Sequence, residues 1–197
     1  ITQYMQECLH LEMSQEKTLI TNAQKPAKFL GYEVLVRKTD VTKRNKFNVP
    51  VRSFNGTVVL KVATETVKNR LEHYEAIKYK MENGVQTWFS KLRGKLMKKK
   101  IEDIVARYNS EIRGFYNYYS IANNVSYAAS KFGYIMEYSM YHTIAAKTNS
   151  SISKVIDKYK KGNDIIVPYH DAKGKLRYRV FYNEGFKRKL PSSFADV

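Results

Sequence analysis

Apolar residues recur at intervals of three and four through the middle of the chain, a spacing that predicts amphipathic helices. We expect these helices over residues 65–81, 85–119, 127–147 and 151–159. The second has a candidate break near Gly94 or near Lys100, and Asn83-Gly84 supplies a stop signal for the first. The body of the chain is therefore predicted to be helical.

The beginning of the chain favours strands instead. Apolar runs at 18–21 and 28–36 flank a loop that contains Pro26, and this arrangement predicts a β-hairpin. The polar and basic residues 37–57 follow as a linker or a loop that orders on its ligand. A short strand over 57–62 then leads into the helices.

The end of the chain returns to β character, because strand-like runs at 165–169 and 176–182 flank a turn at 171–174. The predicted fold class is therefore mainly α: a helical bundle with a short N-terminal β-hairpin and a small C-terminal β-hairpin. The segments are expected at residues 1–36, 37–60, 61–162 and 163–197.

The charge of the chain is strongly positive and unevenly distributed. Lys and Arg number 35 against 18 Asp and Glu, a formal net charge of +17. Residues 1–36 hold three cations and four anions, which leaves 32 cations and 14 anions in the remainder. An excess of this size repels itself unless a polyanion is bound, whereas generic solubility charge has a more balanced mix of signs. A nucleic-acid partner, contacted after residue 36, is therefore expected.

Several other classes of function find no support in the sequence. No run of about 18 apolar residues could cross a bilayer, so no membrane partner is expected. Cys8 is the only cysteine, which excludes an internal disulfide and fits a reducing compartment. The four histidines are too scattered for a metal site, and the six aspartates are dispersed. We therefore predict no catalytic residues, no metal ligands and no cofactor in this chain.

The strongest local signal is the basic segment (91–100), which contains six cations and no acidic residue. In the predicted helix, Lys91, Lys95 and Lys98 lie along one exposed side. Like-charged pairs at this spacing cost a helix about 0.2–0.5 kcal/mol each, and a phosphate backbone reverses that penalty. A solvated helix face is the alternative, but such faces normally carry Glu among the Lys. The candidate ligand-binding residues here are Lys91, Arg93, Lys95, Lys98, Lys99 and Lys100.

Further candidates for nucleic-acid contact are spread along the chain. They are Lys43, Arg44 and Lys46 in the basic loop, Arg107, Arg113 and Asn117 opposite the apolar stripe of the second helix, and Lys131 in the third. Most of the 16 tyrosines are expected to pack in the core, although aromatic rings can stack on unpaired bases.

Ser139, Thr143 and Lys147 are spaced four residues apart on one predicted helix. This row could present two hydroxyls and an ammonium group to a phosphate. It could equally be a contact between helices, with the hydroxyls bonded back to the preceding turn. The sequence leaves both interpretations open.

Taken in order, four motifs resemble the group II intron reverse transcriptase/maturase family. Phe29-Leu30-Gly31-Tyr32 looks like the palm hairpin that supports the primer strand in that family, and 56–60 is similar to its entry into the thumb. Residues 104–119 match the run that leads into domain X. Residues 139–147 look like its second signature, a Ser, then Thr-Leu-Ala, then Lys, with Ile144 in place of the leucine.

The resemblance implies that 1–36 end a palm, that 37–60 are a basic linker and entry strand, and that 61–162 form a helical thumb/domain X bundle. Residues 163–197 would be a basic tail. The implied function is to grip structured intron RNA, which assists splicing and, in a longer protein, supports RNA-templated DNA synthesis. An RNA–DNA hybrid or target DNA would be a further partner, and the oligomeric state stays open.

The same resemblance places the family's catalytic Tyr-Ala-Asp-Asp motif before residue 1. The two Mg²⁺ ions of polymerase chemistry are therefore expected only in the full-length polymerase, and this chain alone is not expected to polymerise DNA. The resemblance also implies an intracellular protein, cytoplasmic in a bacterium or located in an organelle. The alternative function is that of an unrelated basic adaptor that binds DNA or an acidic protein.

Overall fold

A computed structural model describes residues 2–10, 12, 14, 20, 22–38, 41–51 and 55–190. The chain forms two compact units, one made of Ile1–Phe29 and Glu33–Val59 and the other of Leu30–Tyr32 and Leu60–Val197. Among the described residues, 39% are helical and 24% lie in strands, and the strands form three sheets. The prediction of a mainly α fold was therefore wrong.

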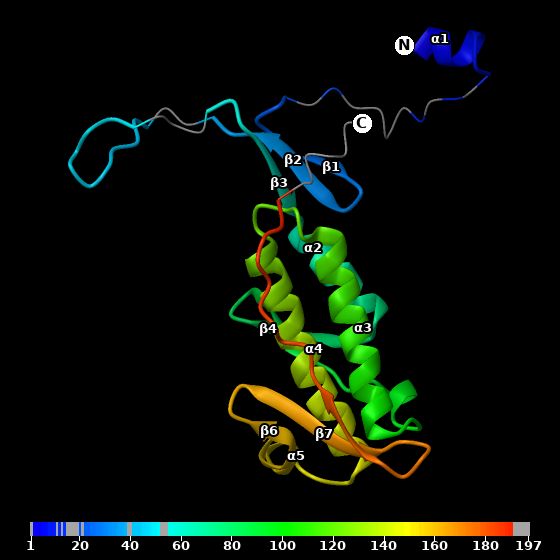
Figure 1. Ribbon diagram of the computed structural model, residues 1–197. Helices are drawn as coiled ribbons and strands as arrows, with labels where there is room; N and C mark the ends of the chain where they lie inside the picture. Colours follow the sequence, from blue (N-terminus) through cyan, green and yellow to red (C-terminus); the bar gives the residue numbers. More distant parts are fainter. Residues whose placement is uncertain are drawn as a thin grey trace. The chain divides into compact units, whose positions relative to one another are not determined.

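The N-terminal part of the chain contains one short helix and a small sheet. These elements are α1 (Thr2–Glu7), β1 (Ala27–Phe29), β2 (Tyr32–Val36) and β3 (Val58–Val62), and the strand order is β1-β2-β3 (Figure 1). Leu30 and Gly31 separate β1 from β2, and both have positive φ (50° and 82°), as two-residue hairpin turns require. The run predicted as one strand over 28–36 thus turns back on itself. The other predicted strand, 18–21, lies outside the described residues except for Ile20.

The second unit contains two long helices that lie side by side, with shorter elements packed around them (Figure 1). The helices are α2 (Thr64–His73), α3 (Ile101–Tyr119), α4 (Val125–Lys147) and α5 (Ile152–Tyr159), and a 3₁₀ turn covers Gly94–Leu96. The strands are β4 (Ile77–Glu82), β5 (Val85–Ser90), β6 (Lys160–Lys161), β7 (Asp164–His170) and β8 (Leu176–Val180). The predicted C-terminal hairpin is present as the antiparallel pair β7–β8.

A β-hairpin lies at residues 77–90, where one helix was predicted to end and the next to begin. β4 and β5 pair antiparallel from Ile77↔Ser90 to Glu82↔Val85. Asn83 and Gly84 form the turn with φ of 51° and 76°, and Asn-Gly is a favoured pair for such turns. The residues interpreted as a helix stop are therefore a hairpin turn, and this change accounts for much of the unexpected strand content.

The hydrophobic core of the second unit lies mainly between α3 and α4. The rings of Phe115 and Phe132 stack with their centroids 4.2 Å apart and their planes 8° apart. The largest fully buried side chains include Tyr108, Tyr141, Phe132, Leu71, Ile104 and Ile112. Because each large apolar side chain contributes about 1.5–3 kcal/mol when fully buried, this interface is the main source of the unit's stability.

The ordered structure of the second unit continues beyond β8. The C-terminal segment (181–190) continues along α3 and α4, as the red and orange trace shows (Figure 1). Asn109 donates to the Val180 carbonyl (2.7 Å) and accepts from the Tyr182 amide (2.8 Å). Tyr116 donates to the Lys187 carbonyl (2.7 Å) and Ser126 to that of Phe186 (2.5 Å). The expected basic tail is thus fastened to the helices by hydrogen bonds between helix side chains and the backbone of the tail.

Gly31 is expected to be the least replaceable glycine of the chain. Its carbonyl accepts from the Thr66 hydroxyl (2.8 Å), and a Cβ at this position would lie 2.5 Å from the Tyr119 hydroxyl. Positive φ costs a non-glycine residue about 1–2 kcal/mol, and relief of the Tyr119 contact adds about 1–3 kcal/mol. Gly31→Ala should therefore lower the free energy of unfolding in urea by the sum of both.

Gly84→Ala is the matched control, because Gly84 has a similar φ of 76° but no atom within 4 Å of the added Cβ. Gly84→Ala should lower the free energy of unfolding only by the cost of a positive φ. Equal losses for the two variants would mean that the contact with Tyr119 is unimportant.

Candidate nucleic-acid interface

The basic segment (91–100) joins β5 to α3 and is not part of a long helix. Apart from the 3₁₀ turn at Gly94–Leu96, it has no regular secondary structure. The expectation that Lys91, Lys95 and Lys98 lie along one helix face was therefore wrong. Arg93 and Leu96 are buried at 8% and 7% exposure, whereas the lysines of the segment are exposed. Two buried side chains thus hold a short irregular segment that presents its lysines to solvent.

Arg93 is held in place by a buried ion pair. Its two terminal nitrogens donate to the two carboxylate oxygens of Glu111, at 2.6 and 3.0 Å. Its guanidinium also lies over the ring of Tyr108, 4.9 Å from the centroid. Burial alone would lower the pKa of Arg93, but the hydrogen bonds and charge of Glu111 outweigh this effect and raise it. The guanidinium is thus occupied within the protein, and its predicted contact with RNA stays a prediction.

Glu111 accepts a third hydrogen bond, from Nε of Arg107 one helical turn away, at 2.7 Å. The Glu111 side chain is 4% exposed, whereas that of Arg107 is 55% exposed. One buried carboxylate therefore binds two arginines, one of which remains accessible to a ligand at the protein surface.

The row Ser139, Thr143 and Lys147 points inward and fastens the basic segment to α4. The Ser139 hydroxyl donates to the Lys91 carbonyl (2.5 Å), and Thr143 Oγ1 accepts from the Arg93 amide (3.0 Å). Lys147 Nζ donates to the Met97 carbonyl (3.0 Å). Ser139 and Thr143 have no exposed surface. Of the two interpretations left open by the sequence, the structure shows a packing contact, with Thr143 also donating back to the Ser139 carbonyl (2.7 Å).

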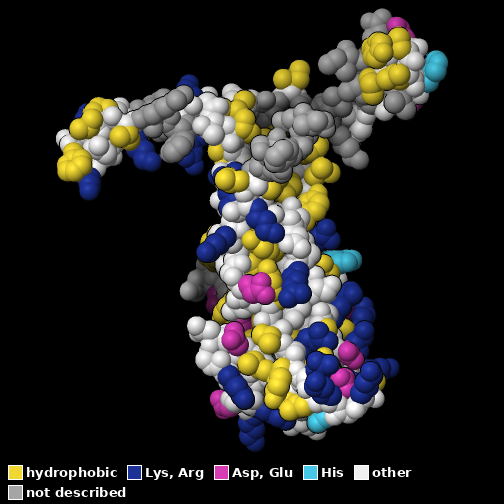
Figure 2. Space-filling model, viewed as in Figure 1, with side chains coloured by type: hydrophobic (Ala, Val, Ile, Leu, Met, Phe, Trp, Pro, Cys, Tyr) yellow, Lys and Arg dark blue, Asp and Glu magenta, His cyan; other side chains and the backbone are white. Residues whose placement is uncertain are grey.

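A groove of about 400 Å³ lies beside the basic segment. Its lining includes Arg93, Lys95, Lys99 and Arg107, and Glu75 is the acidic residue among them. Lys95 Nζ donates to Glu75 at 2.5 Å, and this hydrogen bond lowers the pKa of the Glu75 carboxyl. Figure 2 shows Lys and Arg side chains gathered over this end of the second unit, near the start of α3, with a few acidic groups between them. The surface has the charge and shape to receive a phosphate backbone.

The remaining predicted site residues lie elsewhere. Arg113 and Asn117 are exposed further along α3, and Arg113 covers the ring of Tyr182 at 4.7 Å. Lys131 lies over Trp88, 3.9 Å from the ring centroid. The basic loop residues Lys43, Arg44 and Lys46 belong to the first unit, where Arg44 donates to the Asn48 carbonyl (2.7 Å). The structure does not bring Arg113, Asn117 or Lys131 into the groove beside the basic segment.

The four residues of the primer-grip-like turn differ in exposure. Phe29 and Leu30 are exposed at 63% and 66%, whereas Tyr32 is 8% exposed. The Tyr32 hydroxyl donates to the Tyr118 carbonyl at 2.5 Å, and burial raises the pKa of Tyr32. Gly31 provides the turn between the exposed and buried residues. Contact of this turn with a primer strand stays a prediction.

The outer face of the β4–β5 hairpin was missed by sequence reasoning. Lys78 pairs across the strands with Phe89, and Lys80 pairs with Thr87. Phe89 falls within the helix predicted over 85–119, but it lies in β5 opposite Lys78 and is 37% exposed. The alternation of apolar and polar residues before Asn83-Gly84 is the signal that could have identified this face.

Two general findings concern other kinds of site. In the described ranges, no group of three or more His, Cys, Asp or Glu side chains could hold a metal ion. Within the same residues, no helix is both long and apolar enough to cross a membrane.

The sequence is similar to proteins encoded by introns. A family model for type II intron maturases matches residues 42–177. The group II intron-encoded protein LtrA of Lactococcus lactis subsp. cremoris is 36% identical over 189 residues, which cover 95% of this chain and 31% of that protein. The putative COX1/OXI3 intron 1 protein of Saccharomyces cerevisiae is 32% identical over 167 residues, or 80% of this chain and 19% of that protein. The chain thus spans less than a third of the length of these curated relatives.

We expect the buried Arg93–Glu111 pair to contribute to the free energy of unfolding. Glu111→Gln should lower the free energy of unfolding by about 3–5 kcal/mol, because removal of one partner leaves a buried charge without compensation. Urea denaturation followed by circular dichroism measures this loss. Glu75→Gln removes a carboxylate from an exposed pair with Lys95 and should leave the unfolding midpoint unchanged. A Glu111→Gln variant as stable as Glu75→Gln would show that the buried pair does not hold the segment.

Proposed function

The chain belongs to the type II intron maturase family, and from this membership we propose that it binds structured intron RNA through the basic segment (91–100) and so assists splicing. The observation that carries the proposal is the fixed path of this segment. Its backbone is bound by α4 while its lysines point to solvent. A surface that is ordered before binding loses less conformational entropy when RNA binds.

Electrostatics supports RNA as the ligand. Each phosphate contacted by a lysine or arginine releases condensed counterions, and this release favours binding without regard to base sequence. Lys91, Lys98, Lys99 and Lys100 are exposed, and Lys95 has only an exposed partner in Glu75. Exposed ion pairs contribute little, so a phosphate can replace that partner at small cost.

The outer face of the β4–β5 hairpin extends the proposed interface. Lys78 and Lys80 lie on this face, Lys80 in an exposed ion pair with Glu82 (3.0 Å), and Lys91 comes directly after β5. Phe89 lies opposite Lys78 as an exposed aromatic ring that an unpaired base can stack on. The proposed contact area therefore combines phosphate-binding cations with one stacking side chain.

In a longer protein, we propose that the same surface supports RNA-templated DNA synthesis, with an RNA–DNA hybrid or target DNA as a further partner. LtrA, of which this chain matches 31%, is described as a group II intron-encoded protein. The polymerase step and its two Mg²⁺ ions are proposed only for the full-length protein. The competing function, a basic adaptor for DNA or an acidic protein, is distinguished by the experiment below.

Filter binding over a salt series tests the proposal with a folded group II intron RNA and a DNA duplex of equal length. The wild-type chain should prefer the RNA, and its affinity should fall steeply with salt. The triple variant Lys91→Glu, Lys95→Glu, Lys98→Glu should bind the RNA at least about a hundredfold more weakly. The slope of log K against log salt should fall by about 2–3, since each lost phosphate contact contributes about 0.7–0.9.

The matched control reverses three exposed lysines in and just after α5: Lys154→Glu, Lys158→Glu, Lys161→Glu. It changes the net charge by the same amount and should keep most of the RNA affinity. Equal weakening by both triple variants would show that only total charge matters. Equal affinity of the wild type for duplex DNA would favour the adaptor function instead.

A further inference from the structure

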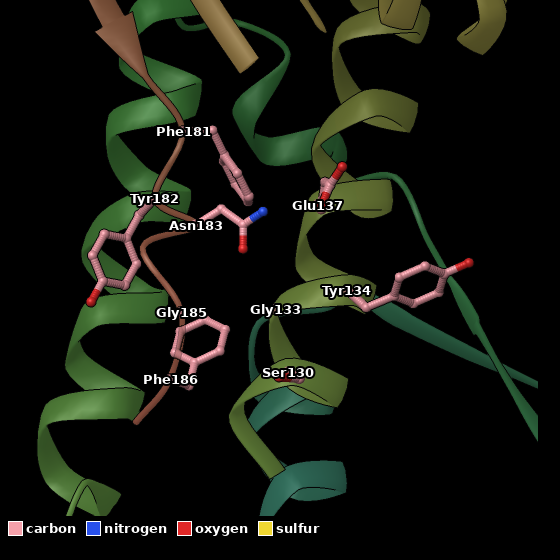
Figure 3. A pocket seen from close by; sticks show the side chains of 9 residues that line it. All are labelled: Ser130, Gly133, Tyr134, Glu137, Phe181, Tyr182, Asn183, Gly185 and Phe186. Atoms are coloured by element: carbon pink, nitrogen blue, oxygen red, sulfur yellow. The ribbon is translucent and has the colours of Figure 1, made fainter. Parts of the chain in front are cut away.

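A small pocket lies between α4 and the C-terminal segment (181–190), away from the basic segment. Its volume is about 230 Å³, and its lining includes Gly133, Glu137, Phe181, Asn183 and Phe186 (Figure 3). Phe181 and Phe186 are 4% and 9% exposed and form apolar walls. Pockets for drug-sized ligands measure about 300–1,000 Å³. The pocket therefore has room for one planar ring system.

Two glycines shape this pocket. The Phe186 ring lies against the bare backbone of α4 at Gly133, where an added Cβ would be 3.3 Å from two ring carbons. Gly185 has a φ of 80°, a conformation that side-chain-bearing residues rarely adopt. The segment bends at Gly185, with Phe186 seated on the helix and Asn183 on the other side of the bend.

Two polar side chains line the pocket from different elements, Asn183 from the C-terminal segment and Glu137 from α4. Figure 3 shows the Asn183 side chain pointing from the C-terminal segment toward α4, where Glu137 lies at the same level. Glu137 is half-buried and forms no salt bridge with any described residue. One turn along α4, the buried Tyr141 hydroxyl has no hydrogen-bond partner within the described part of the chain, and burial and then the nearby Glu137 carboxylate raise the pKa of Tyr141, so this group is a neutral phenol. The pocket thus offers a carboxylate acceptor beside an amide that can donate.

The Glu137 carboxylate repels phosphates, so the pocket does not suit the RNA backbone. The carboxylate accepts hydrogen bonds from N–H or O–H groups, which a ribonucleotide supplies from its base and its ribose, and the apolar walls formed by Phe181 and Phe186 favour the base. Unpaired bases are recognised on their Watson–Crick edges by such polar groups and by packing against aromatic rings. Guanine alone among the four RNA bases presents two adjacent donors, N1–H and N2–H, beside an acceptor, O6.

We propose that this pocket binds one unstacked guanine of the RNA, with the Glu137 carboxylate accepting from N1–H and N2–H and the Asn183 amide donating to O6. This inference rests on the proposed function, because the guanine belongs to the RNA that the chain binds. It assigns base recognition to the pocket and backbone contact to the basic segment. The two surfaces therefore respond to different variants.

The test uses the whole chain and ligand-observed NMR with guanosine, inosine and uridine 5′-monophosphates. Guanosine monophosphate should bind more tightly than uridine monophosphate, and inosine monophosphate, which lacks the N2 amino group, should be intermediate. Glu137→Gln should weaken the binding of guanosine monophosphate about tenfold, the effect of losing one charge-assisted hydrogen bond. Glu184→Gln is the matched control, a carboxylate next to Asn183 that does not line the pocket, and it should bind like the wild type.

A second measurement separates this proposal from the proposed function. It compares two single-stranded RNA octamers, one of uridines only and one with a single central guanosine. Glu137→Gln should remove the preference for guanosine without changing the affinity for the uridine octamer. The triple lysine variant should weaken both octamers alike.

Equal binding of guanosine and uridine monophosphates, or a preference that survives Glu137→Gln in a folded variant, overturns the pocket proposal and leaves RNA binding standing. A chain that prefers guanosine monophosphate but binds neither octamer nor intron RNA overturns the proposed function instead.

Discussion

The geometry of the candidate interface depends on one buried ion pair, Arg93 with Glu111. Removal of two charges from water costs several kcal/mol per ion, and only close pairing with further hydrogen bonds compensates this cost. Here both carboxylate oxygens are used, since Arg93 binds each of them and Arg107 binds one. The pair connects the basic segment to α3, and the Thr143 hydroxyl connects the same residue to α4. An irregular segment thus takes its conformation from α3 and α4, the two long helices of the second unit.

This arrangement divides the positive charge of the chain into two roles. Arg93 is directed inward and is neutralised, while the neighbouring lysines are directed outward and remain hydrated. Arginine suits the first role, because its planar guanidinium can bind a carboxylate with two parallel hydrogen bonds and stack on Tyr108. Lysine suits the second, as a point charge on a flexible stem. In this segment, arginine therefore stabilises the fold, and the lysines form the proposed binding surface.

Sequence reasoning succeeded where a pattern was long and local. The stripe that includes Ile104, Tyr108 and Ile112 predicted the buried face of α3, and the turn at 171–174 predicted the β7–β8 hairpin. It failed at 77–90, because Val85, Trp88 and Phe89 fit a helical spacing as well as a strand, and Asn83-Gly84 can end a helix or turn a hairpin. The local excess of positive charge predicted exposed lysines in the basic segment. It could not show that Arg93 points inward, since that depends on Glu111, 18 residues away in sequence.

The C-terminal segment (181–190) links local unfolding to ligand binding. Its hydrogen-bond partners on α3 and α4 lie 60 to 73 residues earlier in the chain, so its docking closes a long loop and can follow the packing of the helices. The segment also buries Phe181, Tyr182 and Phe186 in the core, so its detachment from the helices would expose these side chains together with the pocket. The pocket exists only while the segment is docked, so any ligand bound there shifts this opening equilibrium toward the docked state. Amide hydrogen exchange in 181–190 would therefore slow when a ligand occupies the pocket. The exchange rates of this segment would thus indicate whether the pocket is occupied.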